Sequence, residues 1–386
     1  MHKYRTAIFV AGALVVAMAL DWALPVLVTD GSVRQLVMLA ACNVVVALSL
    51  NVINGMAGQF SIGHAGFVSL GAYTSAVLSG NMHKWLGGGD ATLARSFIVV
   101  PACLLASAAV AALFGFIVGL PSLRLKGDYL AIVTLGFAEI VRLVIGTAQV
   151  GSGGETIGQA MSSGGALHAL SVAVSKLGGQ NGYMGPDGQG LPLYAGPFWV
   201  LSVTTLACVA AWRLKFSGWG RALRALREDE IAAAAVGVDP TRYKVTSFVI
   251  AAIGGGVAGG LIAQMRDGSY LVNPETFNFQ ASFDAITMVI IGGSGSVSGA
   301  IIGGIFVTVT VKAIEQLQNT SVAQLIRGPH MLGTFELTVD LNALRMIIYS
   351  VVLIALMIRR PEGMLGEREL GQKRPGPRPK SEPAVT

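Results

Sequence analysis

The polar residues best placed for chemistry lie in one glycine-rich stretch between two apolar runs. The stretch NGMAGQFSIGHAGFVSLGAY begins at Asn54 and also contains Gln59, Ser61 and His64. In hydrocarbon each of these polar groups needs a partner, so we expect them to face protein or water. A helix broken here would direct its end dipoles toward a zwitterionic solute.

Glycines in the same stretch indicate either close backbone packing or a break in a helix. We therefore predict a hinge that also forms part of a pore lining. For His64, a purely structural hydrogen bond between helices is favoured over a role with substrate or protons. The residues predicted for the translocation path or hinge are Asn54, Gly58, Gln59, Ser61, Gly63, His64, Gly66 and Asp284.

Charged residues inside the apolar runs are the other candidates. Glu139 with Arg142, and Lys312 with Glu315, are three residues apart, so each pair can partly neutralise itself on a helix. Asp284 has no such neighbour and is the best candidate for an unusual environment. The run GGSGSVSG lacks the context of a dinucleotide loop. Its spacing instead predicts a close-packing helix face made by Gly295, Gly299 and Gly303.

Composition then decides the class of protein. The 386 residues have a mean hydropathy of +0.64, and 12% are charged, about half of what soluble domains carry. We predict an all-α polytopic membrane protein of about ten transmembrane helices. The candidate spans are 6–28, 33–53, 60–80, 96–120, 128–147, 196–212, 243–264, 281–293, 297–317 and 342–358.

Lysine and arginine set the expected orientation. Most of the 27 basic residues fall into four clusters that share one side if both termini are cytoplasmic. The first span is interpreted as an uncleaved helix rather than a signal peptide, because its apolar run is long. We expect one transmembrane domain, 1–358, with an outer loop at 149–195, a cytoplasmic segment at 220–239 and a disordered basic cytoplasmic tail at 359–386.

The cytoplasmic segment GRALRALREDEIAAAAVGVDP is the most informative polar piece. Strong helix formers predict one helix from Arg221 to Val236, ended by Gly237. Its alanine run offers a flat surface for another protein, rimmed by charges of both signs. A short helical element joined directly to membrane helices is what a separate motor protein needs to push on.

Four stretches carry a resemblance to a known family. They are LSLNVINGMAGQFSIGHAGFVSLGAY, the segment GRALRALREDEIAAAAVGVDP with the apolar run after it, MVIIGGSGSVSGAIIGG, and RRPEGMLG. In order and spacing the chain resembles the branched-chain amino-acid permeases of ABC importers, the LivH and LivM kind, from about residue 40 to 366. IAAAAVG resembles the coupling-loop pattern of such permeases, although Ile231 stands where that pattern has an acidic residue.

The resemblance implies a permease subunit in the bacterial inner membrane, with a second related permease, two ATP-binding subunits and an outer solute-binding protein as partners. The expected solute is leucine, isoleucine, valine or a related small molecule. The implied ATPase-coupling residues are Arg227, Glu228, Asp229, Glu230, Ala232, Ala233 and Gly237.

Several alternatives stay open. A permease of the same family for urea, short amides or aromatic acids fits the same pattern, and an ion-coupled secondary transporter would use carboxylates such as Asp284. An enzyme is not expected, because the sequence has no Walker A motif and no paired nucleophile and base. The three cysteines are widely spaced within apolar runs, so no metal and no cofactor is expected.

Overall fold

The protein is described by a computed structural model of 386 residues. The structure describes residues 30–89, 91–122, 128–147, 177–186, 188–318, 330–332 and 335–337, together with residue 28 and scattered positions within 12–23 and 351–370. Nearly all of this part of the chain is helical, as predicted. The departure is a short hairpin, β1 (His330–Leu332) paired antiparallel with β2 (Phe335–Leu337).

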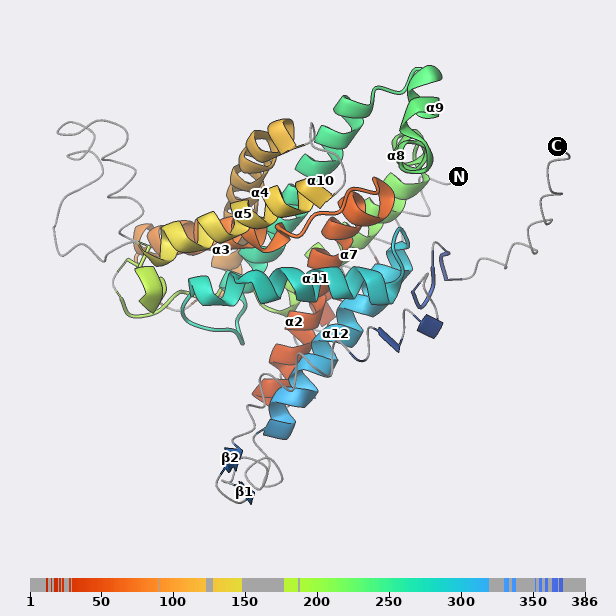
Figure 1. The fold of residues 1–386 in the computed structure, drawn as a ribbon. Coiled ribbons are helices and arrows are strands. Elements are labelled where there is room, and N and C mark those ends of the chain that lie inside the picture. Colours follow the sequence, from red (N-terminus) through yellow and green to blue (C-terminus); the bar gives the residue numbers. More distant parts are fainter. Residues whose placement is uncertain are drawn as a thin grey trace, which may run out of the picture.

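The helices follow one another in a simple order (Figure 1). The first half contains α2 (Gly31–Asn51), the π-helical turn η1 (Val52–Met56), α3 (His64–Trp85), α4 (Leu93–Ser122) and α5 (Asp128–Gly146). The second half contains η2 (Gly179–Asn181), α7 (Pro197–Phe216), α8 (Gly218–Glu228), α9 (Glu230–Ala235), α10 (Pro240–Gln264), η3 (Pro274–Phe277), α11 (Phe279–Gly292) and α12 (Val297–Gln318).

Five of these helices are long and apolar enough to cross a membrane: α2 with η1, α4, α5, α7 and α10. Two more apolar helices, α11 and the first part of α12, are shorter. Eight of the ten predicted spans coincide with helices of the described residues, α3 included. The spans 6–28 and 342–358 fall mostly outside these residues, so the count of ten and the cytoplasmic termini stay predictions.

Helix α10 lies at the centre and packs against α2, α3 and α4. Its run IGGGVAGGL turns a different glycine toward each neighbour. A Cβ on Gly254 would lie 2.5 Å from the Ser49 Cβ of α2, and one on Gly256 would lie 2.5 Å from the Ala111 Cβ of α4. At Gly259 the added atom would lie 1.9 Å from the Val68 carbonyl oxygen of α3. The glycines therefore set how closely these helices approach.

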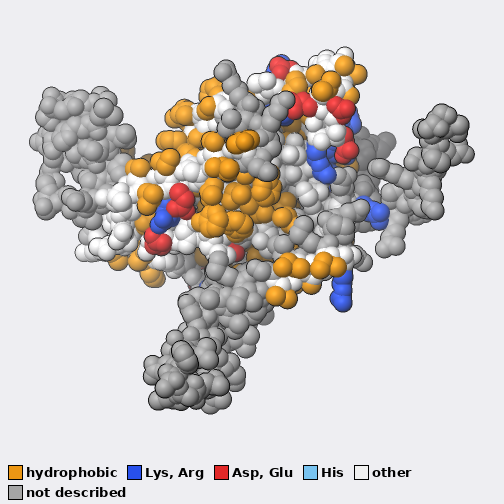
Figure 2. All heavy atoms as spheres, in the orientation of Figure 1, with side chains coloured by type: hydrophobic (Ala, Val, Ile, Leu, Met, Phe, Trp, Pro, Cys, Tyr) orange, Lys and Arg blue, Asp and Glu red, His pale blue; other side chains and the backbone are white. Residues whose placement is uncertain are grey.

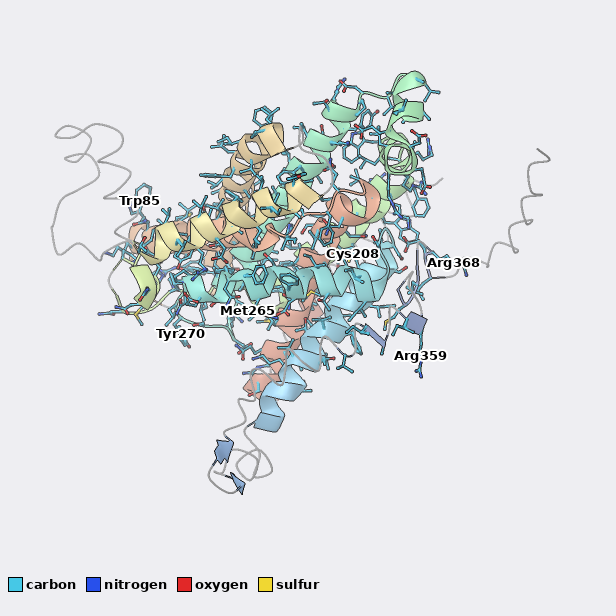
Figure 3. All side chains as sticks on the ribbon, in the orientation of Figure 1. Trp85, Cys208, Met265, Tyr270, Arg359 and Arg368 are labelled. Carbon is cyan, nitrogen blue, oxygen red and sulfur yellow. The ribbon has the colours of Figure 1, made fainter. Side chains whose placement is uncertain are left out.

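The outer surface is apolar along its flanks and charged at one end. Large apolar side chains of α4, α5 and α11 are exposed, and Figure 2 shows such side chains covering the middle of one face. Figure 3 places Arg359 and Arg368 at the end where α8 and α9 lie, and Trp85 and Tyr270 at the opposite end. This distribution is typical of a protein surrounded by an apolar medium with two polar boundaries.

The packing predicts the effect of one methyl group on α10. Gly259→Ala forces the backbones of α10 and α3 apart, so we expect a loss of about 1–3 kcal/mol in the free energy of unfolding. The measurement is thermal unfolding in detergent. The control is Gly136→Ala on α5, where the added atom meets nothing within 4 Å. Equal melting temperatures for the two variants would contradict this account.

Candidate functional site

The predicted hinge stretch contains a real break between two helices. Helix α2 continues past Asn51 into the π-helical turn η1, and residues 57–63 are not helical. π-Helical turns are rare and often occur at functional sites. Asn54 closes the loop that follows, since its Nδ2 donates to the Ser61 carbonyl at 3.3 Å and its Oδ1 accepts from the Ser61 N–H at 3.1 Å. Gly58 adopts a left-handed backbone with φ +67°.

His64 is buried at the start of α3. Its Nε2 lies 2.8 Å from the Ser49 hydroxyl oxygen of α2. That hydroxyl donates to the Val46 carbonyl, so it accepts from His64, and the imidazole proton is assigned to Nε2. The ring also lies against Gly255 of α10. This position between three helices supports the structural alternative for His64.

The glycines of the stretch serve close packing. A Cβ on Gly63 would lie 1.9 Å from the Thr134 carbonyl oxygen, and one on Gly66 would lie 2.9 Å from the Ala138 Cα, so the start of α3 lies directly on α5. Gln59 and Ser61 are buried beside them. Within the described part of the chain, neither the Gln59 Oε1 nor the Ser61 Oγ has a hydrogen-bond partner.

Asn51 is a further residue of the break that was not predicted from the sequence. Its side chain is fully buried, its Oδ1 accepts from the Gly295 N–H at 2.8 Å, and its Nδ2 donates to the Ser296 carbonyl at 3.0 Å. The turn between α11 and α12 is therefore fixed to the end of α2. The available signal was one amide side chain inside the apolar run ALSLNVI.

The predicted glycine face is correct for two of its three residues. Gly299 and Gly303 lie on α12 and pack closely against the Gly292 and Met288 carbonyl groups of α11. Gly295 is different, because it precedes α12 and has φ +87°. It belongs to the turn that meets η1, where a Cβ on Gly55 would lie 2.4 Å from the Gly295 nitrogen.

The single helix predicted for 221–236 is wrong, because Asp229 divides the segment into α8 and α9. Asp229 is extended, with φ −152°, and its Oδ1 accepts from the N–H groups of Ile231 and Ala232 at 2.9 and 3.0 Å. An aspartate in this position starts a new helix by capping it. Gly237 ends α9 in a left-handed conformation, φ +91°, as expected.

The tip of the segment is an exposed apolar surface, which we define as Ile231, Ala232 and Val236. Ile231 is 84% exposed and Val236 is 80% exposed. Of the other predicted coupling residues, Glu228 is exposed, Glu230 pairs with Lys244 at 2.6 Å, and Ala233 is buried. The alanine run therefore does not form one flat face, and the two large aliphatic side chains, Ile231 and Val236, dominate the tip.

Arg227 points away from this tip, toward the break. Its Nη1 donates to the Gly55 carbonyl at 2.7 Å. Its stem covers Gly58, where an added Cβ would lie 2.6 Å from the Arg227 Cγ, and its Nη1 would lie 3.2 Å from a Cβ on Gly295. One side chain therefore joins α8, the end of α2 and the α11–α12 turn.

A second connection reaches the same turn from the chain's last described residues. Residues 363–366 and 368–370 pack against the α11–α12 turn, although the sequence placed them in a disordered tail. The buried Glu369 carboxylate lies 2.5 Å from the Lys215 Nζ at the end of α7. It also accepts from the N–H groups of Val297 and Ser298, both at 2.8 Å, which caps α12.

These contacts also shift the protonation of Glu369. Burial alone would raise the pKa of its carboxyl group, but donation from Lys215, from the Ser298 hydroxyl and from two backbone N–H groups outweighs burial and lowers the pKa below its usual value. A carboxyl group with a lowered pKa stabilises the fold above its usual pKa, and that stability is lost as the pH falls through the lowered value.

We expect Glu369→Gln to cost about 3–5 kcal/mol, because Lys215 then stays buried without its counter-charge. The melting temperature in detergent should fall, whereas the exposed control Glu228→Gln should leave it unchanged. On acidification below the usual pKa of a glutamate, the parent protein should lose stability more steeply than Glu369→Gln. Parallel pH curves for the two proteins would contradict the role of this carboxylate.

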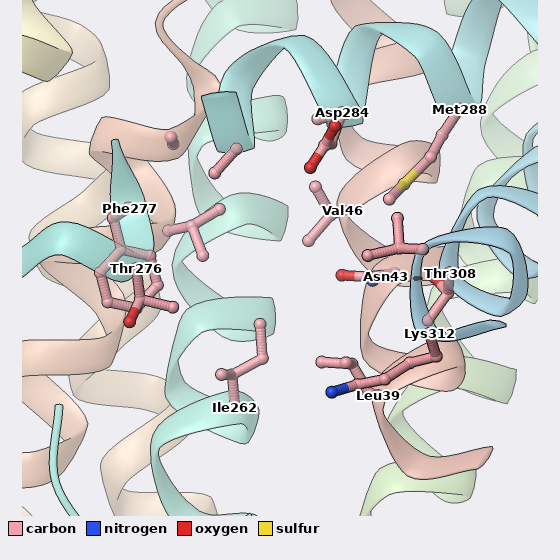
Figure 4. Close-up of a pocket in the computed structure, with 15 residues that line it drawn as sticks. Leu39, Asn43, Val46, Ile262, Thr276, Phe277, Asp284, Met288, Thr308 and Lys312 are labelled. Atoms are coloured by element: carbon pink, nitrogen blue, oxygen red, sulfur yellow. Dashed lines mark hydrogen bonds between the residues drawn. The ribbon is translucent and has the colours of Figure 1, made fainter. Parts of the chain in front are cut away.

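Asp284 lies in the wall of a cavity of about 280 Å³. The cavity is bounded by α2, α3, α10, η3, α11 and α12, and Figure 4 shows the Asp284 carboxylate directed into it from α11. The Gln280 Nε2 donates to the Asp284 Oδ1 at 3.3 Å. Among the described residues, none of the other predicted translocation-path residues lines this cavity.

The other predicted membrane charges are partly paired. Arg142 donates to Glu139 at 2.8 Å, as the spacing predicted, and also to Glu275 of η3 at 2.7 Å. Lys312 lines the cavity opposite Asp284, whereas the side chain of Glu315 lies outside the described residues. Much of the predicted outer loop 149–195 also lies outside them, since the structure describes only residues 177–186 and 188–195 of it.

A helical bundle with membrane-length apolar helices, an interrupted helix and an exposed charged segment is the architecture of a polytopic membrane protein. The sequence matches the family described as branched-chain amino acid transport system / permease component over residues 32–357. The chain belongs to this family.

Individual permease proteins are also similar to this chain in sequence. The high-affinity branched-chain amino acid transport system permease protein LivM of Salmonella typhimurium is 33% identical over 370 residues, which is 94% of this chain and 75% of the relative. The probable LivM of Methanocaldococcus jannaschii is 27% identical over 84% of this chain and 91% of its own length. The permease protein LivH of Salmonella typhimurium is 26% identical over 45% of this chain and 47% of its own. No solved structure matches the chain.

Proposed function

We propose that this chain is one of two permease subunits of an ABC importer that carries branched-chain amino acids inward. Membership of the family supports transport, and the names of the relatives support leucine, isoleucine and valine as solutes. LivM and LivH are named as separate permease proteins, which supports a second, related permease as partner. An outer binding protein delivers the solute to the side that carries the loop 149–195.

The observation that carries the proposal is the Arg227 connection. An exposed apolar tip on α8–α9 has the form of a docking surface for a motor subunit. Arg227 then transmits movement of α8 to the Gly55 carbonyl at the end of α2. The loop 57–63 is suited to change shape, since it contains a left-handed glycine and two buried polar atoms without hydrogen-bond partners.

The same geometry supports a proposed orientation of the chain. In the proposed arrangement α8, α9, Arg359 and Arg368 face the cytoplasm, where two ATP-binding subunits dock on Gly220 to Asp239, and both termini lie on that side. Trp85 and Tyr270 then lie at the outer boundary of a bacterial inner membrane. ATP binding closes the motor subunits, α8 and α9 move, and the break between α2 and α3 changes access to the path.

Affinity capture of the chain from solubilised membranes, followed by mass spectrometry, tests this assembly. We expect two ATP-binding subunits and a second permease, with ATPase activity stimulated by the loaded binding protein. Capture of the chain alone from a stable preparation would favour an ion-coupled secondary transporter. Stimulation by a binding protein loaded with urea, an amide or an aromatic acid would change the solute but retain the importer.

The apolar tip makes a separate prediction. Ile231→Glu places a charge in the proposed contact with the ATP-binding subunits, so we expect their recovery in affinity capture to fall on the order of tenfold. The control is Thr92→Glu, an exposed residue beside the start of α4 that lies outside the proposed docking segment. Equal recovery with both variants would exclude the tip as the docking surface.

The contact between Arg227 and Gly55 leads to another testable prediction. Arg227→Met keeps an unbranched apolar stem but removes the hydrogen bond to Gly55, so we expect transport per ATP hydrolysed to fall about tenfold while the ATP-binding subunits still copurify. Arg221→Met is the control, because Arg221 is exposed and its Nη1 donates to the Phe216 carbonyl at the junction between α7 and α8, away from the break. Unchanged coupling in proteoliposomes with Arg227→Met would show that movement passes elsewhere.

A further inference from the structure

We propose that a groove between α2, α7 and α10 holds one acyl chain of an anionic phospholipid, whose phosphate binds arginines at the end of the bundle that carries α8. The groove has a volume of about 320 Å³ and shares no lining residue with the Asp284 cavity. The site does not depend on the transported solute. In the proposed orientation its lipid belongs to the inner leaflet.

The groove has a buried floor and open walls. Helices α7 and α10 both pack on α2, and all three line the groove. The α2 residues Val45, Leu48 and Val52 are buried and form its floor. The wall made by α7 is more open, since Leu206 is 59% exposed and Ala210 is too small to fill the space beside it. The groove therefore opens onto the surroundings of the bundle.

The length of the groove corresponds to one leaflet. Its lining on α7 extends from Val203 to Leu214, about 16 Å at the rise of an α-helix. One leaflet contributes about 15 Å, half of the hydrocarbon core of a bilayer. A partner's helix is about 10–12 Å across with its side chains, so it would cover the groove rather than enter it. One acyl chain matches these dimensions better.

The lining suits an acyl chain and not a polar solute. Its residues are aliphatic, glycine or alanine, apart from Ser49, and none of them is charged. The Ser49 hydroxyl is already bonded to the Val46 carbonyl and to His64. Lipid tails are as apolar as these side chains, so close dispersion contacts would hold a chain in the groove.

Positive charge lies at the end of the groove nearest α8. Arg213 follows Ala210 by three residues, so it lies on the same face of α7, one turn nearer α8. Arg242 lies about two turns before Ile250 on α10. Both arginines are exposed, and among the described residues neither side chain has a hydrogen bond or an ion pair. A guanidinium group binds phosphate through two parallel hydrogen bonds, which supports a lipid phosphate here.

Aromatic side chains place the membrane boundary at the same level. Trp212 and Phe216 at the end of α7 are both exposed, with ring centroids 5.0 Å apart. Trp219 of α8 stacks on Tyr243 of α10 at 5.9 Å. Tryptophan and tyrosine concentrate where a membrane meets water. The lipid headgroup is therefore expected at the level of the two arginines, with its chain directed along the groove.

A chain in the groove would contact the interrupted helix. Val52 of the floor is the first residue of η1, and Ser49 of the floor holds His64 at the start of α3. A bound lipid would thus support the end of α2 where the break begins. We expect anionic lipid to raise the melting temperature of the protein, because a ligand that binds only the folded state stabilises it.

The experiment measures lipid binding to the purified full chain in detergent by native mass spectrometry. The chain is titrated with phosphatidylglycerol and, separately, with phosphatidylcholine of the same acyl chains. We expect one phosphatidylglycerol to bind about tenfold more tightly, because choline already neutralises the phosphate of the other lipid. Phosphatidylglycerol should also raise the melting temperature more.

Two variants test the charge. Arg213→Gln and Arg242→Gln should each weaken phosphatidylglycerol binding, by up to about tenfold, and leave phosphatidylcholine binding unchanged. The control is Lys84→Gln, which removes an exposed charge from the last turn of α3, at the opposite end of the bundle. This control should keep the parent's preference for phosphatidylglycerol.

A third variant tests the groove. Ala210→Trp fills it, so the affinity for both lipids should fall about tenfold and phosphatidylglycerol should no longer raise the melting temperature. The matched control is Ala109→Trp, because Ala109 is an exposed alanine of α4 outside the lining. Both alanines are exposed, so neither tryptophan disturbs the core.

A phosphatidylglycerol with a diazirine in its acyl chain gives the position. Irradiation should label peptides of α2, α7 and α10 more than those of α4 and α5, both in the chain alone and in the captured assembly. Equal labelling of all these helices, or equal lipid affinity of the parent and Ala210→Trp, would overturn the proposal. Cross-linking of α7 to a second permease, with loss of the lipid label in the assembly, would instead identify the groove as a subunit interface.

Discussion

The short distance between helix backbones around α10 is the constraint on which the rest of the structure depends. Gly254, Gly256 and Gly259 face α2, α4 and α3, and none of these contacts leaves room for even a methyl group. In an apolar medium there is no hydrophobic force to bring helices together, so close packing and hydrogen bonds must do it. The same helix, α10, also supplies Ile262 to the wall of the cavity.

A chain of short polar contacts runs from the exposed tip to the helices that enclose the cavity. Arg227 binds the Gly55 carbonyl, Asn51 binds the turn at Gly295, and that turn leads directly into α12, which carries Lys312. Each contact joins a side chain to a backbone group, so movement of α8 acts on rigid elements and not on side chains alone. The structure therefore contains a continuous series of contacts between the exposed tip and the helices around the cavity, and our proposed function assigns coupling to it.

Hydropathy and glycine spacing predicted most of the helices, because both depend on local sequence. The glycines also predicted the close contacts of Gly63 and Gly66, and the three-residue spacing of two charges predicted the pair of Glu139 with Arg142. The division at Asp229 was not predicted, because the residues around it are strong helix formers and favour one continuous helix. Asp229 itself favours a capping position, and its carboxylate caps the start of α9. The roles of Asn51 and Glu369, and the inward direction of Arg227, depend on partners distant in sequence, which no local pattern contains.

The Glu369 contact also sets an order on how the chain can assemble. Its carboxylate caps the start of α12 from a position 71 or 72 residues further along the chain. A chain made from its amino end must therefore leave the first turn of α12 uncapped, and Lys215 without this counter-charge, until those later residues emerge. During synthesis the α11–α12 pair thus lacks its final contacts. The binding of Glu369 to the start of α12 and to Lys215 is one of the last events of folding.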